Sequence, residues 1–226
     1  FPMEDLKSIL KELADNLTPG LLQYGETEGY RPLREEVVKL MASKGVNVPV
    51  DNVLITAGSQ QGLDLIAKSF ITPGDKIVVE SPTYLAALQT FRMYGAQFIE
   101  APVDADGVIA EELDRILANE ENVKLIYMIP TFQNPSGRTV TAERRQAIMD
   151  VVKKYDVVLI EDAPYEDLKY TDDVYPCIKS MDTTGQVLYF GSFSKVIEAL
   201  LRYLLAIYWN IFDSYIVIVD KKFSRQ

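Results

Sequence analysis

The sequence predicts an α/β protein with three layers (α/β/α), in which helices cover both faces of a mostly parallel sheet. Short apolar runs alternate with longer amphipathic segments along most of the chain. This alternation is typical of parallel strands joined by helices. The 226 residues, of which 48% are hydrophobic and 25% charged, are enough for one large domain or two small ones.

The expected helices follow from apolar spacing and from the residues that begin and end helices. Residues 3–17 carry apolar side chains on one helical face, and the Thr-Pro-Gly run at 18–20 ends that segment. A proline suits the start of a helix over 32–43, and Thr141 caps a helix that runs to residue 155. Three further helices are expected, ending near residues 70, 94 and 117.

The expected strands are short apolar runs, at residues 53–56, 76–80, 97–100, 123–130, 157–162, 187–193 and 215–219. Residues 200–219 are almost wholly apolar and aromatic, so a membrane-spanning helix is one alternative there. Arg202, Asn210 and Asp213 interrupt this run, and a charge within a membrane is costly. A buried helix followed by the strand at 215–219 is therefore the expected structure, with no membrane partner.

Composition excludes several classes of function. The formal net charge of −10 argues against a nucleic-acid partner, whose binding would need a basic stripe. The absence of histidine excludes serine–histidine–aspartate catalysis and histidine metal sites within this chain, and no metal is expected. Cys177 is the one cysteine, so no intrachain disulfide can form. A cytoplasmic location is expected, since the first residues also lack the pattern of a signal peptide.

Polar residues follow several of the expected strands, at the edge of a parallel sheet where ligands bind. Gly58-Ser59-Gln60 forms either a turn with a helix cap or a cradle of N–H groups for a phosphate. Asp162 is either a solvated acid or a buried one that needs a cationic partner. Lys195 is either a surface lysine or, if desolvated, an amine able to form a Schiff base.

For the other candidates at strand ends, an ordinary structural role is again the alternative to ligand binding. Tyr84 either packs against the core or stacks on a flat ligand. The segment 133–137 has the composition of a turn, although Asn134 could donate to a ligand oxygen. With Tyr165 and the serines at 192 and 194, the converging set favours a phosphorylated, aromatic and partly cationic ligand.

Six motifs occur in order along residues 1–197. They are Tyr24-Gly25 with Gly29, Gly58-Ser59-Gln60-Gln61, Ser81-Pro82-Thr83-Tyr84, Pro130 to Gly137, Glu161 to Tyr165, and Ser192-Phe193-Ser194-Lys195. Together they resemble the fold-type I aminotransferases that use pyridoxal 5′-phosphate (PLP). The likeness is greatest to the class I/II branch that includes 2-aminoadipate, kynurenine and aromatic aminotransferases. It implies the large domain of an aspartate aminotransferase-like fold.

The resemblance implies a role for each candidate. Lys195 would hold the cofactor as a Schiff base and then move a proton between the substrate Cα and the cofactor C4′. Asp162 would keep the pyridinium nitrogen protonated, and Tyr84 would stack on the ring as a third catalytic residue. The other implied cofactor contacts are Asn134 and Tyr165 at the phenolic oxygen, Ser59, Gln60, Ser192 and Arg202 at the phosphate, Ser194 beside them, and Tyr24 at the phosphate of a neighbouring subunit.

These roles imply an enzyme that transfers an amino group from an L-amino acid to a 2-oxo acid, and a homodimer with shared sites. Two alternatives stay open: the PLP-binding effector domain of a GntR/MocR-type transcription regulator, and a folded fragment without turnover. After residue 197 the glycines of the family pattern are missing, and its later half has no match. The expected division is an N-terminal helix of the small domain or arm (1–19), the PLP-binding large domain (20–197) and an atypical apolar tail (198–226).

Overall fold

A computed structural model describes residues 3–18, 23–168, 173–193, 195 and 215–218. Within these residues a seven-stranded sheet has the spatial order β1-β9-β8-β7-β6-β2-β3. Neighbouring strands are parallel except at β9, which runs antiparallel to both β1 and β8. The strands are β1 (Val53–Thr56), β2 (Lys76–Glu80), β3 (Gln97–Ala101), β6 (Val123–Met128), β7 (Val158–Ala163), β8 (Val187–Ser192) and β9 (Tyr215–Ile218).

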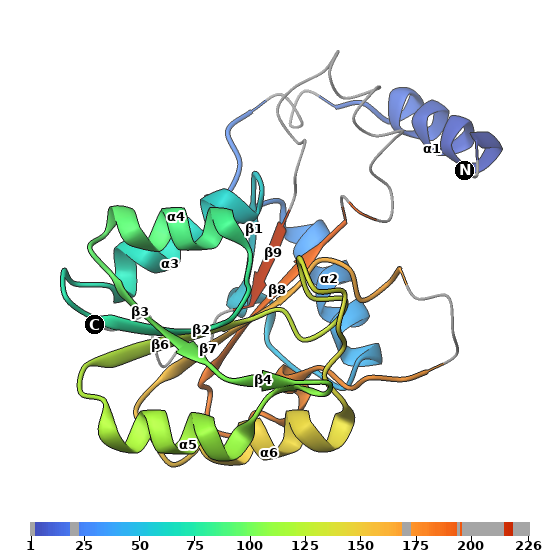
Figure 1. Ribbon diagram of the computed structural model, residues 1–226. Coiled ribbons are helices and arrows are strands. Elements are labelled where there is room, and N and C mark those ends of the chain that lie inside the picture. Colours follow the sequence, from blue (N-terminus) through green and yellow to red (C-terminus); the bar gives the residue numbers. More distant parts are fainter. Residues whose placement is uncertain (1–2, 19–22, 169–172, 194, 196–214, 219–226) are drawn as a thin grey trace.

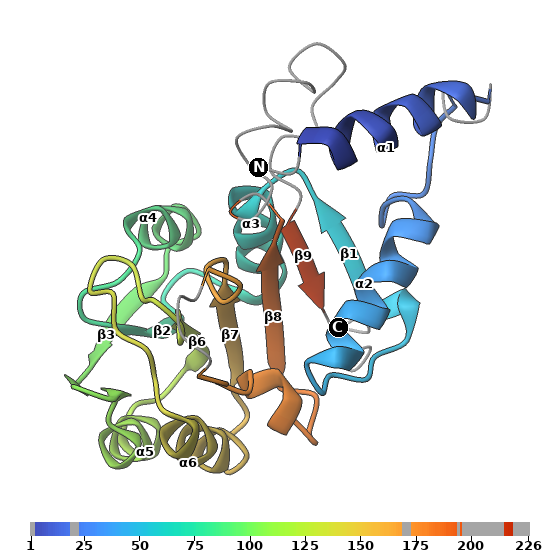
Figure 2. The ribbon, with the colours of Figure 1, turned by 90° about the vertical axis from the view of Figure 1, so that its right-hand side faces the viewer.

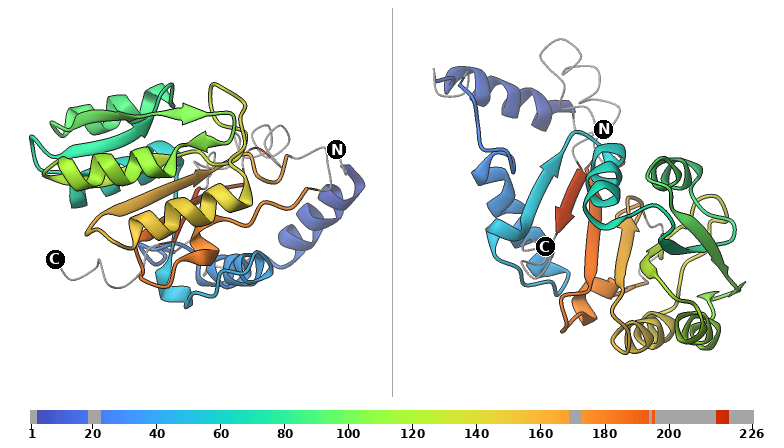
Figure 3. Two further views of the ribbon diagram at one scale, coloured as in Figure 1. Left: turned by 60° about the horizontal axis from the view of Figure 1, so that its bottom comes forward. Right: turned by 90° about the vertical axis from the view of Figure 1, so that its left-hand side faces the viewer.

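Helices cover both faces of the sheet, which confirms the predicted three-layer architecture (Figure 1). On one face lie α3 (Ser59–Phe70) and α4 (Leu85–Met93). On the other, α5 (Ala110–Asn119) and α6 (Ala142–Val152) lie side by side (Figure 3). The helix α2 (Arg31–Ser43) extends this second layer, because its buried side chains pack against β1 and β9.

Alternation along the strands divides the core between the two faces. On β8, Leu188 and Phe190 pack beneath α3 and α4, whereas Tyr189 between them packs with the side chains of α2. On β9, Val217 and Ile216 separate in the same way. All five residues are at least nine-tenths buried. Burial of each large apolar side chain contributes about 1.5–3 kcal/mol, so both layers stabilise the sheet.

The strand β9 confirms the prediction of a strand at 215–219. It lies between β1 and β8 (Figure 2), so residues 215–218 are an integral part of the sheet. The helix expected just before this strand lies outside the described residues, and the domain boundary at residue 198 stays a prediction. In the parts of the chain that are described, none of the helices has the length and hydropathy of a membrane span.

The remaining differences from the sequence predictions are small. The first helix, α1 (Met3–Asp15), ends two residues before the expected position, and it lies apart from the sheet (Figure 1). Thr141 is a helix cap as predicted, because its side chain accepts a hydrogen bond from the N–H of Arg144. A short hairpin of β4 (Val103–Asp104) and β5 (Gly107–Val108) was not predicted, since two-residue strands show no sequence periodicity.

One buried acid organises the turn that leads into β8. Asp182 accepts hydrogen bonds from the N–H groups of Gly185 at 2.8 Å and Val187 at 3.0 Å, and from Lys179 Nζ at 3.0 Å. Its side chain is fully buried. Burial alone would raise the pKa of Asp182, but donation from Val187 and the charge of Lys179 outweigh it and lower the pKa to about 2. The ionised carboxylate therefore stabilises this turn.

We expect Asp182→Asn to lower the free energy of unfolding by about 2–4 kcal/mol at pH 7, because several buried N–H groups lose a charged acceptor. The folded pKa lies below the unfolded value, so this stabilisation is present above about pH 4 and is lost as the pH falls toward 2. Urea unfolding of both proteins across this pH range measures the effect. Asp106→Asn, at an exposed aspartate, is the matched control. A loss below 1 kcal/mol at pH 7 would contradict the assignment.

Candidate active site

The candidate residues lie at one edge of the sheet, where the parallel strands end. Thr56 at the end of β1 and Ser192 at the end of β8 both pair with Tyr215 of β9. Neighbouring strands are about 5 Å apart, so these two strand ends are separated by about 10 Å. On β7, Asp162 pairs with Phe190 of β8. The structure thus brings the ends of β1, β7 and β8 to a shared edge.

Asp162 is buried at this edge, and only one of its two carboxylate oxygens accepts a hydrogen bond within the described residues. The residue is 3% exposed, and its Oδ2 accepts a 2.6 Å hydrogen bond from the Tyr127 hydroxyl. Its Oδ1 is buried and has no hydrogen-bond partner within the described residues. Burial raises the pKa of Asp162 to about 6, although the bond from Tyr127 opposes this shift. Because an unpaired buried acceptor is costly, Oδ1 is suited to a ligand with an N–H or cationic group.

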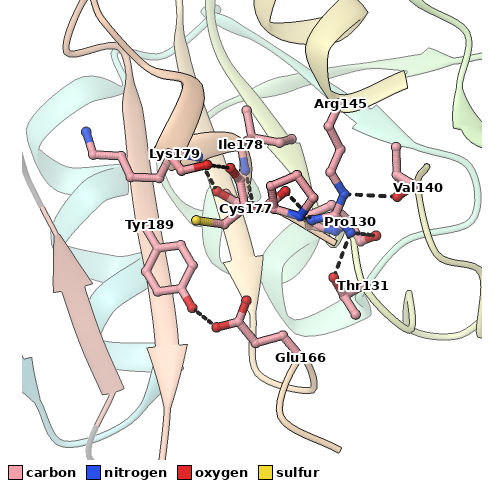
Figure 4. Close-up of polar contacts among 12 residues, drawn as sticks. Pro130, Thr131, Val140, Arg145, Glu166, Cys177, Ile178, Lys179 and Tyr189 are labelled. Atoms are coloured by element: carbon pink, nitrogen blue, oxygen red, sulfur yellow. Dashed lines mark hydrogen bonds and ion pairs between the residues drawn. The ribbon is translucent and has the colours of Figure 1, made fainter. Parts of the chain in front are cut away.

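The loop that carries Asn134 is fixed at both ends by a buried arginine of α6. Arg145 donates to the carbonyl oxygens of Pro130 at 2.8 Å and Val140 at 2.9 Å (Figure 4). It also donates to the hydroxyl of Thr131 at 2.8 Å. Its side chain is 1% exposed. Since the guanidinium group presents its donors in a rigid plane, these bonds hold the loop over residues 130–140 in one conformation.

A second acid, Glu161, lies directly behind Asp162 on the opposite face of the sheet. Its two carboxylate oxygens accept hydrogen bonds from the N–H groups of Ile178 and Lys179, each at 2.8 Å. Arg145 Nη1 lies 3.9 Å from its Oε1. Burial raises the pKa of Glu161 to about 7, against the effect of the two backbone donors. This acid therefore anchors the segment before β8 and faces away from the candidate site.

Glu80 and Gln133 fix the Asn134 loop from the side of β2. Glu80 Oε2 accepts a 2.9 Å hydrogen bond from the N–H of Ile129. The side chain of Gln133 donates to the carbonyl oxygen of Pro82 at 2.7 Å and accepts from the N–H of Ser136 at 2.8 Å. Burial raises the pKa of Glu80 to about 8, although the Ile129 bond opposes it. Both side chains hold the loop in place.

A pocket of about 540 Å³ opens where this loop faces the turn after β7. Asn134 and Tyr165, both partly buried, line it together, and their expected contact with one ligand oxygen stays a prediction. An amide and a phenol can both hydrogen-bond a ligand oxygen, while the apolar remainder of the wall suits a flat ring. The full lining is Phe132, Gln133, Asn134, Pro135, Gly137, Tyr165 and Leu168.

The start of α3 brings backbone N–H groups to the same edge. Gly58 precedes the helix with φ 138°, a conformation that favours glycine. A Cβ on Gly62 would lie 2.4 Å from the ring of Phe190, so this glycine lets the helix pack close to β8. The first N–H groups of a helix have no intrahelical acceptor and suit an anion. The side chain of Gln60 donates to Thr90, so the expected contact of Gln60 with a phosphate falls to its backbone N–H in the first turn of α3.

The other predicted residues are placed as follows. Ser59 is the first residue of α3, and Tyr84 directly precedes α4, where it packs against the core; both are partly buried. Lys195 is partly buried three residues after the end of β8. Tyr24 is fully exposed, and its expected contact with a second subunit stays a prediction. Two of the expected residues lie outside the described ranges: Ser194 and Arg202.

Sequence reasoning missed the residues that support the site. Tyr127 and Glu80 each stand as a polar residue directly after consecutive apolar strand residues, which was an available signal. Gln133 is part of a recognised motif, but no role was expected for it. Arg145 gave no signal, because its partners lie in a loop whose shape the sequence does not reveal.

The family model for aminotransferase class I and II matches residues 1–199. The chain belongs to this family. The chain is 41% identical over 203 residues to aromatic-amino-acid aminotransferase 1 of Thermococcus litoralis, a match that covers 87% of this chain and 48% of that protein. It is also 31% identical over 203 residues to YdfD, an uncharacterized HTH-type transcriptional regulator of Bacillus subtilis, covering 89% of this chain and 41% of the regulator.

The fold of this chain matches solved structures as well. Kynurenine aminotransferase of Pyrococcus horikoshii, solved in complex with PMP, superposes with a TM-score of 0.86 at 37% identity. The match covers 100% of this chain and 54% of that one. The comparisons confirm the predicted family and the fold-type I large domain. The chain spans about half the length of the curated relatives it matches.

We expect Glu80→Gln to flatten the pH dependence of the stability of this chain. The folded pKa of Glu80, about 8, lies above its unfolded value, so its contribution to stability is present below pH 4.5 and is lost as the pH rises toward 8. The decline in unfolding free energy over this range should shrink by about 1–3 kcal/mol in the variant. Part of the decline should remain, because Asp162 and Glu161 also have raised pKa values.

Urea unfolding at several pH values measures this slope. Glu100→Gln is the matched control, because Glu100 is an exposed glutamate on the neighbouring strand β3. Equal slopes for wild type and Glu80→Gln would show that Glu80 does not take up a proton on folding.

Proposed function

We propose that this chain is the cofactor-binding part of a PLP-dependent aminotransferase, which moves an amino group from an L-amino acid to a 2-oxo acid. One observation carries the proposal. Asp162 is a buried acid at the ligand edge of the sheet, and its Oδ1 lacks a hydrogen-bond donor within the described residues. A protonated ring nitrogen would supply that donor and balance the charge. The PMP complex of the Pyrococcus horikoshii relative supports the same cofactor class.

The residues at this edge fit the other parts of PLP. The first turn of α3 and the Ser192 end of β8 offer donors to its phosphate. Asn134 and Tyr165 line one pocket and can hydrogen-bond its phenolic oxygen. Tyr84 is the candidate for stacking on the ring. In this proposal Ser194, Arg202 and, across a homodimer interface, Tyr24 complete the phosphate contacts.

When bound, PLP supplies an electron-accepting ring that stabilises negative charge at the substrate Cα. Asp162 keeps the ring nitrogen protonated and so preserves this capacity. Lys195 has two roles: its Nζ amine holds the cofactor before the substrate arrives, and afterwards it takes the proton from the substrate Cα. The loop fixed by Arg145 keeps Asn134 in place during both stages, which limits the reorganisation that the site needs.

The substrate class follows the named relatives. We propose an aromatic amino acid, kynurenine, 2-aminoadipate or a similar L-amino acid, as in the aminotransferases of Thermococcus litoralis, Pyrococcus horikoshii and Thermus thermophilus. A 2-oxo acid would be the second substrate. We also propose a cytoplasmic enzyme, which a sequence with one cysteine supports. The 226-residue chain by itself is expected to turn over little, since it spans about half the length of these relatives.

A second function has support from one comparison. The 31% identity with the Bacillus subtilis regulator fits a PLP-binding effector domain that binds ligands without turnover. The two functions differ in one observable. An enzyme converts bound PLP to its amino form when a substrate amino acid is added, whereas an effector domain binds the amino acid without that conversion.

We expect added PLP to give a visible absorbance band in the wild-type chain, and borohydride to fix the cofactor covalently on Lys195. Lys195→Ala should lose the band and the label, because its Nζ forms the bond. Absorbance and peptide mass mapping after reduction measure both effects. Lys68→Ala, at an exposed lysine of α3, should behave as wild type. A label retained in Lys195→Ala, or none in wild type, would reject the assignment.

A further inference from the structure

Tyr127 is placed to act on Asp162 from inside the core. It lies in β6, next to β7, and its hydroxyl donates to Asp162 Oδ2 at 2.6 Å. The residue is 0% exposed, so water cannot replace this donor. Of the two carboxylate oxygens, the one bonded to Tyr127 is satisfied and the other is left without a partner within the described residues.

The tyrosine itself has little freedom to move. Its ring packs edge-on against Phe91 of α4, with centroids 5.8 Å apart and an interplanar angle of 73°. Burial, together with the charges of Asp162 and Glu80, raises the pKa of Tyr127 well above its ordinary value. The hydroxyl therefore keeps its proton and remains a donor. A fixed donor defines both the orientation of the carboxylate and the oxygen that remains available.

We propose that Tyr127 is a positioning residue that acts through Asp162: it occupies Oδ2, turns Oδ1 toward the cofactor ring nitrogen and favours the ionised carboxylate. This inference rests on the proposed function, since the ring nitrogen belongs to PLP. The shared proton can lie on the ring nitrogen or on the carboxylate. A donor at Oδ2 stabilises the negative carboxylate, so the proton lies on nitrogen, where it makes the ring the stronger electron acceptor.

The proton position can be measured directly. The ring nitrogen of ¹⁵N-labelled PLP gives an NMR signal whose position differs between protonated and neutral nitrogen. In wild type we expect the protonated position. In Tyr127→Phe the signal should move toward the neutral position, and the dissociation constant for PLP should rise about tenfold or more, because the charged acceptor has lost its donor.

Tyr155→Phe is the matched control. Its hydroxyl also donates to an aspartate, Asp114 Oδ1 at 2.7 Å, but this pair joins α5 to the turn after α6 on the opposite face of the sheet. It should leave both the signal and the affinity unchanged. A folded Tyr127→Phe with wild-type signal and affinity would overturn the inference while leaving the proposed function intact. Absence of PLP binding in wild type would instead reject the proposed function.

A second pair of variants covers failure of Tyr127→Phe to fold, because Asp162→Asn removes the buried carboxylate that Tyr127→Phe alone would leave without a donor. In Asp162→Asn the acid is removed, so Tyr127 has no carboxylate on which to act. Asp162→Asn and the double variant Asp162→Asn/Tyr127→Phe should then have PLP dissociation constants within about twofold of each other. A further tenfold loss in the double variant would show that Tyr127 acts by another route, and would overturn the inference.

Discussion

The antiparallel pairing of β9 with both β1 and β8 is the constraint on which the site depends. The strand β9 lies between β1, the first strand in the sequence, and β8, the last of the parallel strands. Because β9 runs antiparallel to both, β1 and β8 run parallel to each other and end at the same edge. The helix that follows β1 therefore starts beside the end of β8. The first turn of α3, where a phosphate is expected to bind, and the segment of Lys195 are more than 130 residues apart in sequence, and this one strand brings them together.

Acids buried near this edge set the electrostatics of the site. Glu80, Glu161 and Asp162 all have raised pKa values, and burial is the main cause in each case. Such groups cost stability at neutral pH unless they are well bonded. Glu80 and Glu161 use backbone N–H donors to fix neighbouring segments. Asp162 alone among them keeps an oxygen without a donor in the described structure, and this difference separates a binding role from a structural one.

Much of the fold could be predicted, because each strand and helix leaves a local pattern. The strands of the sheet, the cap at Thr141 and the strand-end position of Asp162 followed from periodicity and turn chemistry. The supporting contacts could not be predicted, since they join residues far apart in sequence. Gln60 and Thr90 are 30 residues apart, and Tyr127 and Asp162 are 35 apart. Only the pairing of the strands brings such residues into contact.

Two adjacent residues of β7 carry carboxylates to opposite faces of the sheet. Glu161 anchors the segment before β8, and Asp162 faces the candidate cofactor site. Because side chains alternate along a strand, a shift of β7 by one residue would exchange the two acids between faces. The register of β7 therefore places both the buried anchor, Glu161, and the proposed cofactor acid, Asp162. An insertion or deletion within this strand would damage folding and cofactor binding together, so β7 should tolerate substitutions far better than changes of length.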